Sequence, residues 1–331
     1  MDIAVIGAGI IGLTSALRLG EAGHRVTVYA REHPPHTTSD RAAAIWWPDL
    51  AADPSFVSTA YRQRVLHWAR HSWEAYRSLA GQPEYGIRPE RCHIFYAEQP
   101  EPPLAAEIVP FSRLHHEPHL PGGLAWHWEF DSLLINMARL MPQLVADCRA
   151  AGHALRHGSF THLDELLALD ADLVVNCTGL GSRELCPDPD LVPIRGQLLH
   201  LRPQPVPYKL TVPWNGRSIY WMARDDVLIL GGSYEPGVEE TEPTPDEIEA
   251  IWQAHQSWLA AGAGGLPAPA LRREDILGAA AGIRPHRRHG VRLELEWRQG
   301  RPVVHNYGHG GCGISLAWGC AAEVVALVEA L

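Results

Sequence analysis

The sequence has a single lysine, Lys209, so arginine supplies nearly all of its positive charge. The formal net charge is -10, and no run of basic residues offsets it anywhere along the chain. Proteins that bind nucleic acid neutralise phosphates with clustered lysine and arginine side chains. The charge balance therefore argues against a nucleic-acid partner.

The six cysteines form no Cys-x-x-Cys pair and lack the spacing of a metal site: Cys92, Cys148, Cys177, Cys186, Cys312 and Cys320. We therefore expect reduced thiols in a cytoplasmic protein. A histidine group at His115, His116 and His119 lies among prolines, which favours a surface loop over a metal site. We expect no metal ion.

Long apolar runs and internal repeats are also missing. No stretch of about 18 uncharged apolar residues is present, so we expect no membrane span. The first predicted strand begins at residue 2, and we expect no signal peptide before it. The chain has 331 residues, of which 46% are hydrophobic and 20% charged. This is the composition of a globular protein with two domains, or with one domain and a large insertion.

What the sequence does have is the pattern Gly-x-Gly-x-x-Gly, at Gly7, Gly9 and Gly12. A mostly β-branched run precedes it and apolar residues at helical spacing follow it, the context in which the pattern binds a dinucleotide. Gly7 allows the tight turn, Gly9 lets a pyrophosphate approach the backbone, and Gly12 brings helix and strand together. The helix N-terminus then offers N–H groups and a partial positive charge to the phosphates.

A second strand, residues 25–29, completes a β-α-β unit. Dinucleotide folds place an acidic residue at the end of this strand to hold a ribose hydroxyl. Here the sequence at that place is Ala30-Arg31-Glu32. Either Glu32 serves one residue late or Arg31 lies against the adenosine end, and an arginine there also leaves NADP open.

The rest of the chain does not alternate regularly between strands and helices. Residues 49–130, rich in Trp, His, Pro and Arg, are interpreted as an inserted region. Apolar residues at helical spacing predict further helices over residues 59–79, 131–151 and 245–259, and a final one to Leu331. Strand patterns occur at residues 171–179, 197–201, 218–222 and 227–231, and the last two predict antiparallel pairing.

Three glycine-bearing turns, far apart in the sequence, each follow a predicted strand: Gly7–Gly12, Asn176–Gly179 and Gly308–Gly313. A nicotinamide dehydrogenase needs only the first of them. Three turns that converge on one ligand indicate a large cofactor in an extended pose, and FAD suits this better than NAD(P). The alternative is that the last two are ordinary tight turns.

These motifs resemble the D-amino-acid oxidase family of FAD-dependent flavoproteins, over nearly the whole chain. The matching residues are Val5–Leu13, Val28–Ala30, Thr37–Asp40 with Ala42, Ala43 and Trp46, Asn176–Gly179, Arg195–Gln197, Gly282–Pro285 and His305–Gly311. The first block occurs in many flavoproteins, whereas the last is highly specific.

The resemblance implies an α/β fold made of two interleaved parts. One is a discontinuous Rossmann-like FAD-binding domain, residues 1–50, 131–195 and 278–331. The other is an α+β substrate domain with an antiparallel sheet, residues 51–130 and 196–277. In this family FAD lies extended along the glycine turn, and the substrate domain covers the flavin.

The resemblance also assigns the site residues. Arg284 and Tyr220 would hold the substrate carboxylate, and the backbone carbonyl of Gly311 would lie near the substrate amine. Arginine suits a carboxylate because its planar fork donates two parallel hydrogen bonds. The residues expected at FAD are Gly7, Ala8, Gly9, Ile10, Ile11, Gly12, Arg31, Thr37, Thr38, Ser39, Ala43, Cys177, Thr178, Gly179, Arg284, Gly308, Gly310, Gly311, Gly313, Ile314 and Ser315.

Each of these assignments has a structural alternative. Arg284 could be a salt-bridged strand arginine, and Tyr220 could be an aromatic packed on a sheet face. The hydroxyls of residues 37–39 could simply cap a helix, a role that does not exclude contact with a phosphate.

The implied reaction is oxidative deamination of a D-amino acid to a 2-oxo acid, ammonia and hydrogen peroxide. The substrate binds as a neutral amine, hydride leaves Cα for flavin N5, and O2 reoxidises the flavin. The clamp formed by Arg284 and Tyr220 supplies a near-attack geometry, so no side-chain base is expected. The expected partners are a small D-amino acid and O2, and a homodimer is compatible with the family.

The chain departs from the family pattern at three places. The segment Trp214–Ile219 is too short for the tyrosine-bearing lid of eukaryotic members. Arg31 stands where an acid is common, and Cys312 where an aromatic is frequent. The wall of the substrate pocket near Cys312 is therefore not defined by the resemblance.

Two further positions bear on the choice of substrate. D-Aspartate oxidases tend to carry a serine in place of Gly311 and an arginine after the glycine pair, where this chain has Tyr234. Both differences favour neutral or apolar D-amino acids, although Arg217 could reach an acidic side chain. D-Aspartate oxidase, a glycine or sarcosine oxidase, an FAD-binding protein without turnover and an NADP-dependent reductase are the alternatives.

Overall fold

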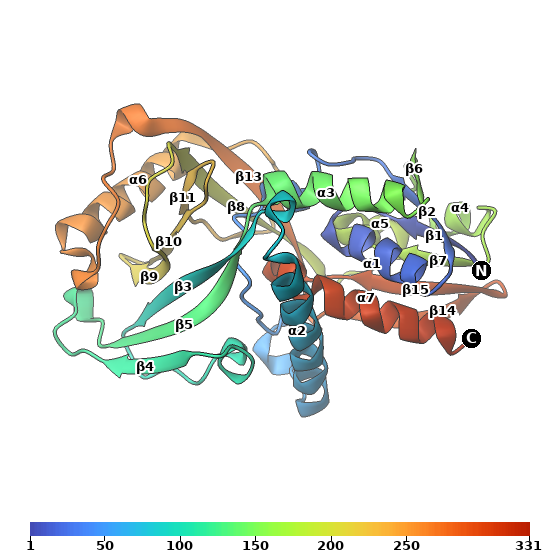
Figure 1. The fold of residues 1–331 in the computed structure, drawn as a ribbon, viewed down its shortest axis with the longest axis horizontal. Coiled ribbons are helices and arrows are strands. Elements are labelled where there is room, and N and C mark those ends of the chain that lie inside the picture. Colours follow the sequence, from blue (N-terminus) through green and yellow to red (C-terminus); the bar gives the residue numbers. More distant parts are fainter.

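The structure is a computed structural model that describes residues 1–331, and each of its two lobes is built on one β-sheet (Figure 1). The lobe with both chain termini contains a six-stranded sheet in the order β14-β15-β7-β1-β2-β6. All neighbouring strands in it are parallel except β14 and β15. These strands are β1 (Asp2–Ile6), β2 (Arg25–Ala30), β6 (Ala154–His157), β7 (Leu173–Asn176), β14 (Arg292–Arg298) and β15 (Arg301–Tyr307).

The other lobe contains a nine-stranded, mainly antiparallel sheet in the order β12-β8-β11-β10-β9-β3-β5-β4, with β13 paired to β8 outside that order. Only β3 and β9 run parallel. Its strands are β3 (Ile87–Tyr96), β4 (Ser112–His116), β5 (Trp126–Ile135), β8 (Leu191–Leu201), β9 (Tyr208–Trp214), β10 (Arg217–Ala223), β11 (Leu228–Gly231), β12 (Glu235–Pro236) and β13 (Ile276–Arg287).

Helices cover both sheets. They are α1 (Ile10–Glu21), α2 (Thr59–Leu79), α3 (Met137–Ala150), α4 (Leu163–Leu167), α5 (Ser182–Leu185), α6 (Pro245–Ala260) and α7 (Gly313–Glu329). Ile3 and Val5 join the large core with α1, α3 and α7, whereas Ala4 and Ile6 pack with α4 and α5. This alternation is what a strand covered on both faces requires. In the other lobe, α6 covers one face of the nine-stranded sheet.

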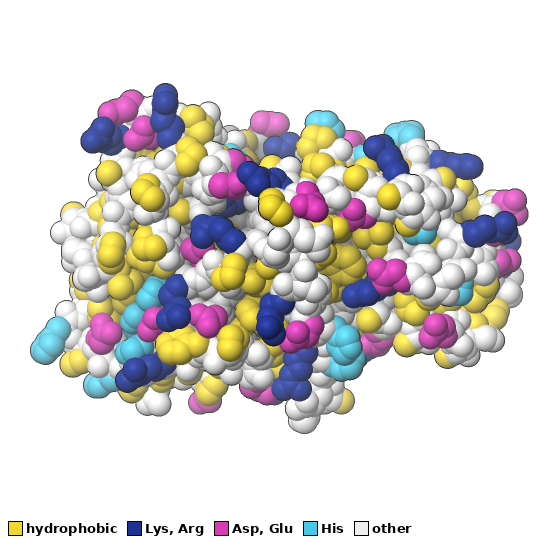
Figure 2. Space-filling view, viewed as in Figure 1, with side chains coloured by type: hydrophobic (Ala, Val, Ile, Leu, Met, Phe, Trp, Pro, Cys, Tyr) yellow, Lys and Arg dark blue, Asp and Glu magenta, His cyan; other side chains and the backbone are white.

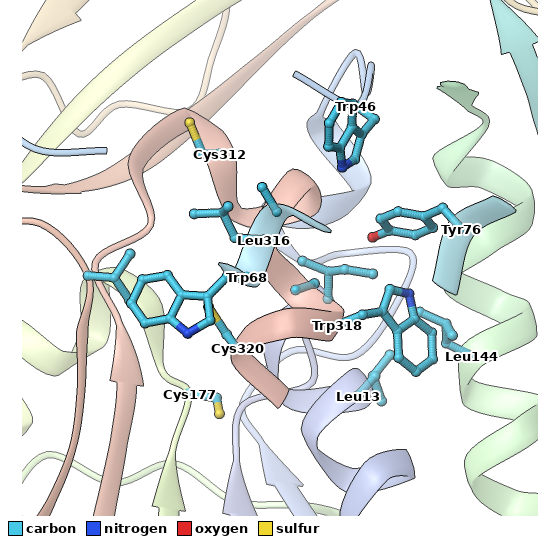
Figure 3. Close-up of a cluster of buried hydrophobic side chains, with 14 of the residues drawn as sticks. Leu13, Trp46, Trp68, Tyr76, Leu144, Cys177, Cys312, Leu316, Trp318 and Cys320 are labelled. Atoms are coloured by element: carbon cyan, nitrogen blue, oxygen red, sulfur yellow. The ribbon is translucent and has the colours of Figure 1, made fainter. Parts of the chain in front are cut away.

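The C-terminal helix is part of the core. By length and composition the segment Gly310–Glu329 is apolar enough to cross a membrane. In the fold, Trp318 and Cys320 are buried where α7 packs on α1 and α2 (Figure 3). At the crossing with α2, the Gly319 N–H donates to Ser72 Oγ at 3.0 Å. Packing inside the protein therefore accounts for the apolar character of this helix.

Charged side chains are spread over the surface. On the face shown in Figure 2, basic and acidic side chains lie next to one another over both lobes. Many charged side chains of the protein form pairs, such as Arg183 with Glu239 at 2.6 Å. This face carries no large patch of one sign, although the chain as a whole is acidic.

Several predicted elements are confirmed, and one helix prediction is wrong in part. The first strand, turn, helix and second strand are present, as are the helices predicted over 59–79 and 245–259. Within the helix predicted over 131–151, however, residues up to Ile135 belong to β5, which pairs with β3. The helix begins only at Met137, after Asn136 accepts a hydrogen bond from the Ala138 N–H. Tertiary pairing overrides the local apolar spacing here.

Two of the three histidines expected on a surface loop are placed differently, whereas His119 lies in the exposed turn after β4. His115 and His116 end β4, the edge strand beside β5. The His115 ring stacks on His127 at 5.2 Å, and His127 stacks on His93 at 4.8 Å. These rings therefore pack as a small stack on the sheet. No group of three His, Cys, Asp or Glu side chains in the structure is placed to hold a metal ion.

The sheets also bear on the predicted division into domains. The predicted limits at residues 131, 195 and 278 fall inside β5, β8 and β13, and all three strands belong to the nine-stranded sheet. If each sheet defines a domain, those limits move to the ends of the strands. The division by residue range stays a prediction.

The crossing of α2 and α7 gives a stability prediction. A Cβ at Gly319 would lie 2.1 Å from the Trp68 carbonyl oxygen, so Gly319→Ala must push the two helices apart. We expect the free energy of unfolding to fall by about 1–3 kcal/mol, measured by urea denaturation followed by circular dichroism. Gly81 has open space around it, so Gly81→Ala is the control. Equal effects of the two substitutions would contradict the prediction.

Candidate active site

The glycine pattern forms the turn between β1 and α1. Gly7 has a φ of +115°, in the region that favours glycine, and a Cβ there would lie 2.4 Å from the Cys177 carbonyl oxygen. A Cβ at Gly12 would lie 1.9 Å from the Gly7 carbonyl oxygen. Neither position has room for a side chain. The two glycines therefore set the close packing of the turn on β7 and α1, as the sequence predicts.

Ser39 lies at the N-terminus of α1. The Ile10 N–H, in the first turn of the helix, donates to Ser39 Oγ at 2.9 Å. A Cβ at Gly9 would lie 3.2 Å from the same oxygen. The structure thus brings together the glycine turn and the hydroxyl segment after β2, two of the groups predicted to meet FAD. Helix N-termini of this kind bind phosphate through their N–H groups.

Two other predicted hydroxyls are used within their own turns. Thr37 caps the short helix η1 (Thr38–Arg41): its N–H and Oγ1 donate to Asp40 Oδ2 at 2.9 and 2.6 Å. Thr178 Oγ1 donates to Asn176 Oδ1 at 2.8 Å. These side chains shape their turns, so the capping alternative holds for Thr37.

The three glycine turns follow the carboxyl ends of neighbouring strands in the six-stranded sheet. Ile6 pairs with Asn176 and Asn176 with His305 in parallel register, so β1, β7 and β15 end side by side. Strand β13 contacts η1, η6 (Gly179–Gly181) and η9 (Gly310–Cys312). Segment η1 belongs to the hydroxyl segment after β2, whereas η6 and η9 belong to the second and third glycine turns. Three of the segments predicted to meet FAD therefore lie along β13.

The expected ribose position holds two unpaired side chains. Arg31 and Glu32 follow β2, and both are exposed. Neither side chain makes a hydrogen bond or ion pair in the structure. The geometry therefore leaves both available to the nucleotide and does not choose between them.

The third turn offers a buried polar atom that fits the flavin of FAD. His309 is only 3% exposed, and its Nε2 has no hydrogen-bond partner. Burial lowers the pKa of His309 to about 3, so the ring is neutral. A buried polar atom without a partner needs an explanation, and the isoalloxazine carries the carbonyl and ring nitrogen atoms that would satisfy it. The residues present therefore fit FAD.

The start of α7 behind this turn is fixed by two hydrogen bonds. Ser315 Oγ accepts from the Trp47 N–H at 2.8 Å, and the Tyr76 hydroxyl donates to the Ile314 carbonyl oxygen at 2.9 Å. Both predicted residues therefore position the turn through the protein itself.

A cavity of about 770 Å³ lies next to the third turn. It is lined by Tyr220 from β10, Arg284 from β13 and Gly311. Its volume is within the range of about 300–1,000 Å³ that is typical of small-molecule sites. All three residues predicted to bind substrate thus line the same cavity.

Arg284 has no carboxylate partner, so the alternative of a salt-bridged strand arginine is not what the structure shows. Its only hydrogen bond, from Nη1 to the Ser233 carbonyl oxygen, is long at 3.4 Å. The guanidinium lies over Gly196, where a Cβ would be 2.4 Å from both terminal nitrogens. Glycine at this position therefore makes room for the guanidinium, most of whose donors are free for a ligand.

Tyr220 lies against the glycine pair that ends β11. A Cβ at Gly231 would be 2.0 Å from the tyrosine Cζ, and one at Gly232 would be 2.5 Å from Cε1. Burial raises the pKa of the Tyr220 hydroxyl, and the neighbouring Arg284 guanidinium opposes that shift. The hydroxyl therefore stays protonated at neutral pH and can donate to a carboxylate held by Arg284.

The other arginines near the cavity are paired. Arg217 binds Glu247 through two parallel hydrogen bonds, from Nη1 to Oε1 and from Nη2 to Oε2, the second at 3.0 Å. Arg195 pairs with Glu235. Although burial raises the pKa of Glu235, hydrogen bonds from Arg195, Gln197 and Ser233 lower it to about 2. Arg284 is thus the arginine lining the cavity whose charge no carboxylate balances.

Sequence reasoning missed five ionisable residues that line this cavity: Asp49, Asp53, Glu235, Glu247 and His286. His286 Nε2 lies 2.8 Å from Asp53 Oδ1, although the two residues are 233 positions apart. A signal for His286 was available, because residues two apart on a strand share a face and it follows Arg284 at that spacing. Asp53 and Glu247 belong to no motif that would have indicated them.

Comparisons with known proteins identify the family of the chain. The family model for FAD dependent oxidoreductases matches residues 2–327. The chain is 37% identical to a D-amino-acid oxidase of Rubrobacter xylanophilus over 329 residues, which cover 98% of this chain and 95% of that protein. It is 34% identical to a D-amino-acid oxidase of Streptomyces coelicolor over 333 residues, which cover 99% and 97%.

Solved structures show the same fold. A glycine oxidase from Bacillus cereus matches with a TM-score of 0.72 and 16% identity, over 99% of this chain and 95% of that one. At this identity the likeness concerns the fold alone. Combined with the family match and the two full-length relatives, it confirms the resemblance that the motifs carry. The chain belongs to the D-amino-acid oxidase family of FAD-dependent oxidoreductases.

Proposed function

We propose that this protein oxidatively deaminates neutral or apolar D-amino acids to 2-oxo acids, ammonia and hydrogen peroxide, with FAD and O2, in the cytoplasm. The observation that carries the proposal is the unpaired Arg284 guanidinium beside the Tyr220 hydroxyl in one cavity. Family membership supplies the class of reaction, and two of the relatives are D-amino-acid oxidases. The six free thiols support a reducing compartment.

The clamp fixes one end of the substrate. Arg284 donates to the substrate carboxylate, and the neutral Tyr220 hydroxyl donates to the same group. The Gly311 carbonyl oxygen, in the wall of the same cavity, accepts a hydrogen bond from the amine. When bound, FAD supplies the hydride acceptor and passes the electrons to O2. Holding both ends of the amino acid orients its Cα–H bond before the reaction, which lowers the entropic part of the barrier.

The paired arginines support neutral side chains over acidic ones. An acidic substrate needs a free cation for its second carboxylate, and Glu247 already accepts hydrogen bonds from both terminal nitrogens of Arg217. Tyr234, which follows the glycine pair, is 66% exposed and carries no charge. These observations weigh against D-aspartate oxidase.

The activity has a direct test. Purified holoprotein should be yellow. Under anaerobic conditions, D-alanine should bleach the absorbance of its oxidised flavin at about 450 nm. L-Alanine at the same concentration is the control and should leave the spectrum unchanged. A colourless protein, or one bleached by neither enantiomer, would sink the proposal.

Arg284→Lys tests the carboxylate clamp. Lysine keeps the charge but loses the planar fork, so one charge-assisted hydrogen bond is lost, about 1.5–3 kcal/mol. We expect kcat/KM for D-alanine to fall about 10- to 150-fold. Arg273→Lys alters an exposed pair with Glu249 away from the cavity and is the matched control. A similar small loss in both variants would contradict the assignment.

Glu247→Gln tests the choice between neutral and acidic substrates. The substitution releases Arg217, so the ratio of kcat/KM for D-aspartate to that for D-alanine should rise about tenfold, the equivalent of one ion-pair contact of about 1.4 kcal/mol. The double variant Arg217→Gln/Glu247→Gln should lose this gain. If the ratio of kcat/KM stays raised in the double variant, Arg217 does not bind the substrate side chain.

A further inference from the structure

A buried histidine of α6 contacts the main chain of Tyr220. His255 is fully buried, and its Nε2 lies 3.1 Å from the Tyr220 carbonyl oxygen. The neighbouring residues Ile219 and Trp221 pack with α6 in one core cluster. The Tyr220 side chain extends to the other face of β10, where it lines the cavity. His255 therefore reaches Tyr220 from the face of the sheet opposite to the substrate.

Both ring nitrogens of His255 face carbonyl oxygens, which only accept hydrogen bonds. Nδ1 lies 2.8 Å from the carbonyl oxygen of Ile251, four residues earlier in α6. Burial lowers the pKa of His255, and the hydrogen bonds to the two carbonyl oxygens oppose that shift. The ring is therefore neutral at pH 7 and carries one hydrogen for two acceptors.

The contact with Ile251 follows from helix geometry. The same contact occurs in α2, where Nδ1 of the exposed His71 lies 3.0 Å from the His67 carbonyl oxygen. The contact with Tyr220 instead joins two separate elements, α6 and β10. Two lone pairs facing each other in this buried interface would repel, so a hydrogen on Nε2 accounts for the separation of 3.1 Å.

We propose that His255 is a positioning residue for substrate binding. By donating its Nε2–H to the Tyr220 carbonyl oxygen, it fixes the Tyr220 hydroxyl relative to Arg284. The tyrosine ring lies against the backbone of Gly231 and Gly232, so a shift of its main chain would displace the hydroxyl as well. His255 itself does not line the cavity. The inference rests on the proposed function and adds a residue that acts through Tyr220.

A second contact between α6 and β10 supports this role. Glu247, in the first turn of α6, binds Arg217, which lies three residues before Tyr220 on β10. His255 lies about two turns farther along the helix. The helix thus attaches to this strand at two points, and only the contact of His255 reaches a residue of the carboxylate clamp.

Two amide variants distinguish the two ring nitrogens. The amide nitrogen of glutamine can reach the place of histidine Nε2, whereas that of asparagine reaches only the place of Nδ1. His255→Gln should therefore keep the hydrogen bond to Tyr220, and His255→Asn should lose it. Urea denaturation of both variants establishes that they are folded.

The measurement is the affinity of each holoenzyme for propionate, followed through the absorbance of FAD. Propionate offers a carboxylate to the clamp but has no amine to be oxidised, so binding is measured apart from turnover. We expect the Kd to rise about 3- to 10-fold in His255→Asn, the effect of one neutral hydrogen bond, and less than about twofold in His255→Gln. Equal effects of the two substitutions would overturn the inference.

Tyr220→Phe separates positioning from general damage. If His255 acts through the Tyr220 hydroxyl, His255→Asn should change the Kd for propionate by less than about twofold once that hydroxyl is absent. A loss of affinity of the same size in both backgrounds would not depend on the hydroxyl, and would also overturn the inference.

Gln256→Ala is the matched control on the same helix. Gln256 Nε2 donates to the Leu271 carbonyl oxygen at 3.3 Å, outside the sheet. The variant loses a hydrogen bond of α6 but should keep the wild-type affinity for propionate. A rise in Kd like that of His255→Asn would show that any weakening of α6 has this effect, and the role of His255 would fall.

The ring hydrogen can also be located in the unchanged protein. In wild-type holoenzyme isotopically labelled at the histidine ring nitrogens, nuclear magnetic resonance should show a hydrogen on Nε2 of His255. The resonance is assigned by its absence in His255→Gln. A hydrogen on Nδ1 alone would overturn the inference, whether or not His255→Asn folds.

These outcomes are separate from those of the proposed function. If D-alanine does not bleach the wild-type protein, the proposed function fails. If D-alanine bleaches it and the asparagine and glutamine variants bind propionate equally well, only the role of His255 fails.

Discussion

The antiparallel pairing of β13 with β8 is the contact on which the site depends. It runs in continuous register from Gly278 opposite His200 to Arg287 opposite Leu191. The same strand contacts three of the segments predicted to hold FAD, η1, η6 and η9, and carries Arg284 and His286. Because side chains alternate along a strand, a slip of one residue would turn both groups away from the cavity. The pairing of β13 with β8 therefore positions Arg284 relative to the segments predicted to hold FAD.

The pairing of charges distinguishes one of the arginines near the cavity from the others. Arg217 and Arg195 are matched by Glu247 and Glu235, whereas Arg284 extends over the bare backbone of Gly196 without a carboxylate. Arg284 is half-buried in the wall of the cavity, and an anionic ligand there would balance its charge. The protein thus leaves one charge unbalanced at the place where the carboxylate of a substrate would complete it, and compensates the others internally.

The sequence predicts local features of this fold better than long-range ones. Gly7 and Gly12 predict the turn because strand, turn and helix are contiguous in the sequence. The family motifs indicate Arg284, Tyr220 and Gly311. The helix prediction over residues 131–135 fails because pairing with β3, distant in sequence, outweighs local spacing. The Asp53–His286 contact could not be predicted, since its partners are 233 residues apart and neither belongs to a motif.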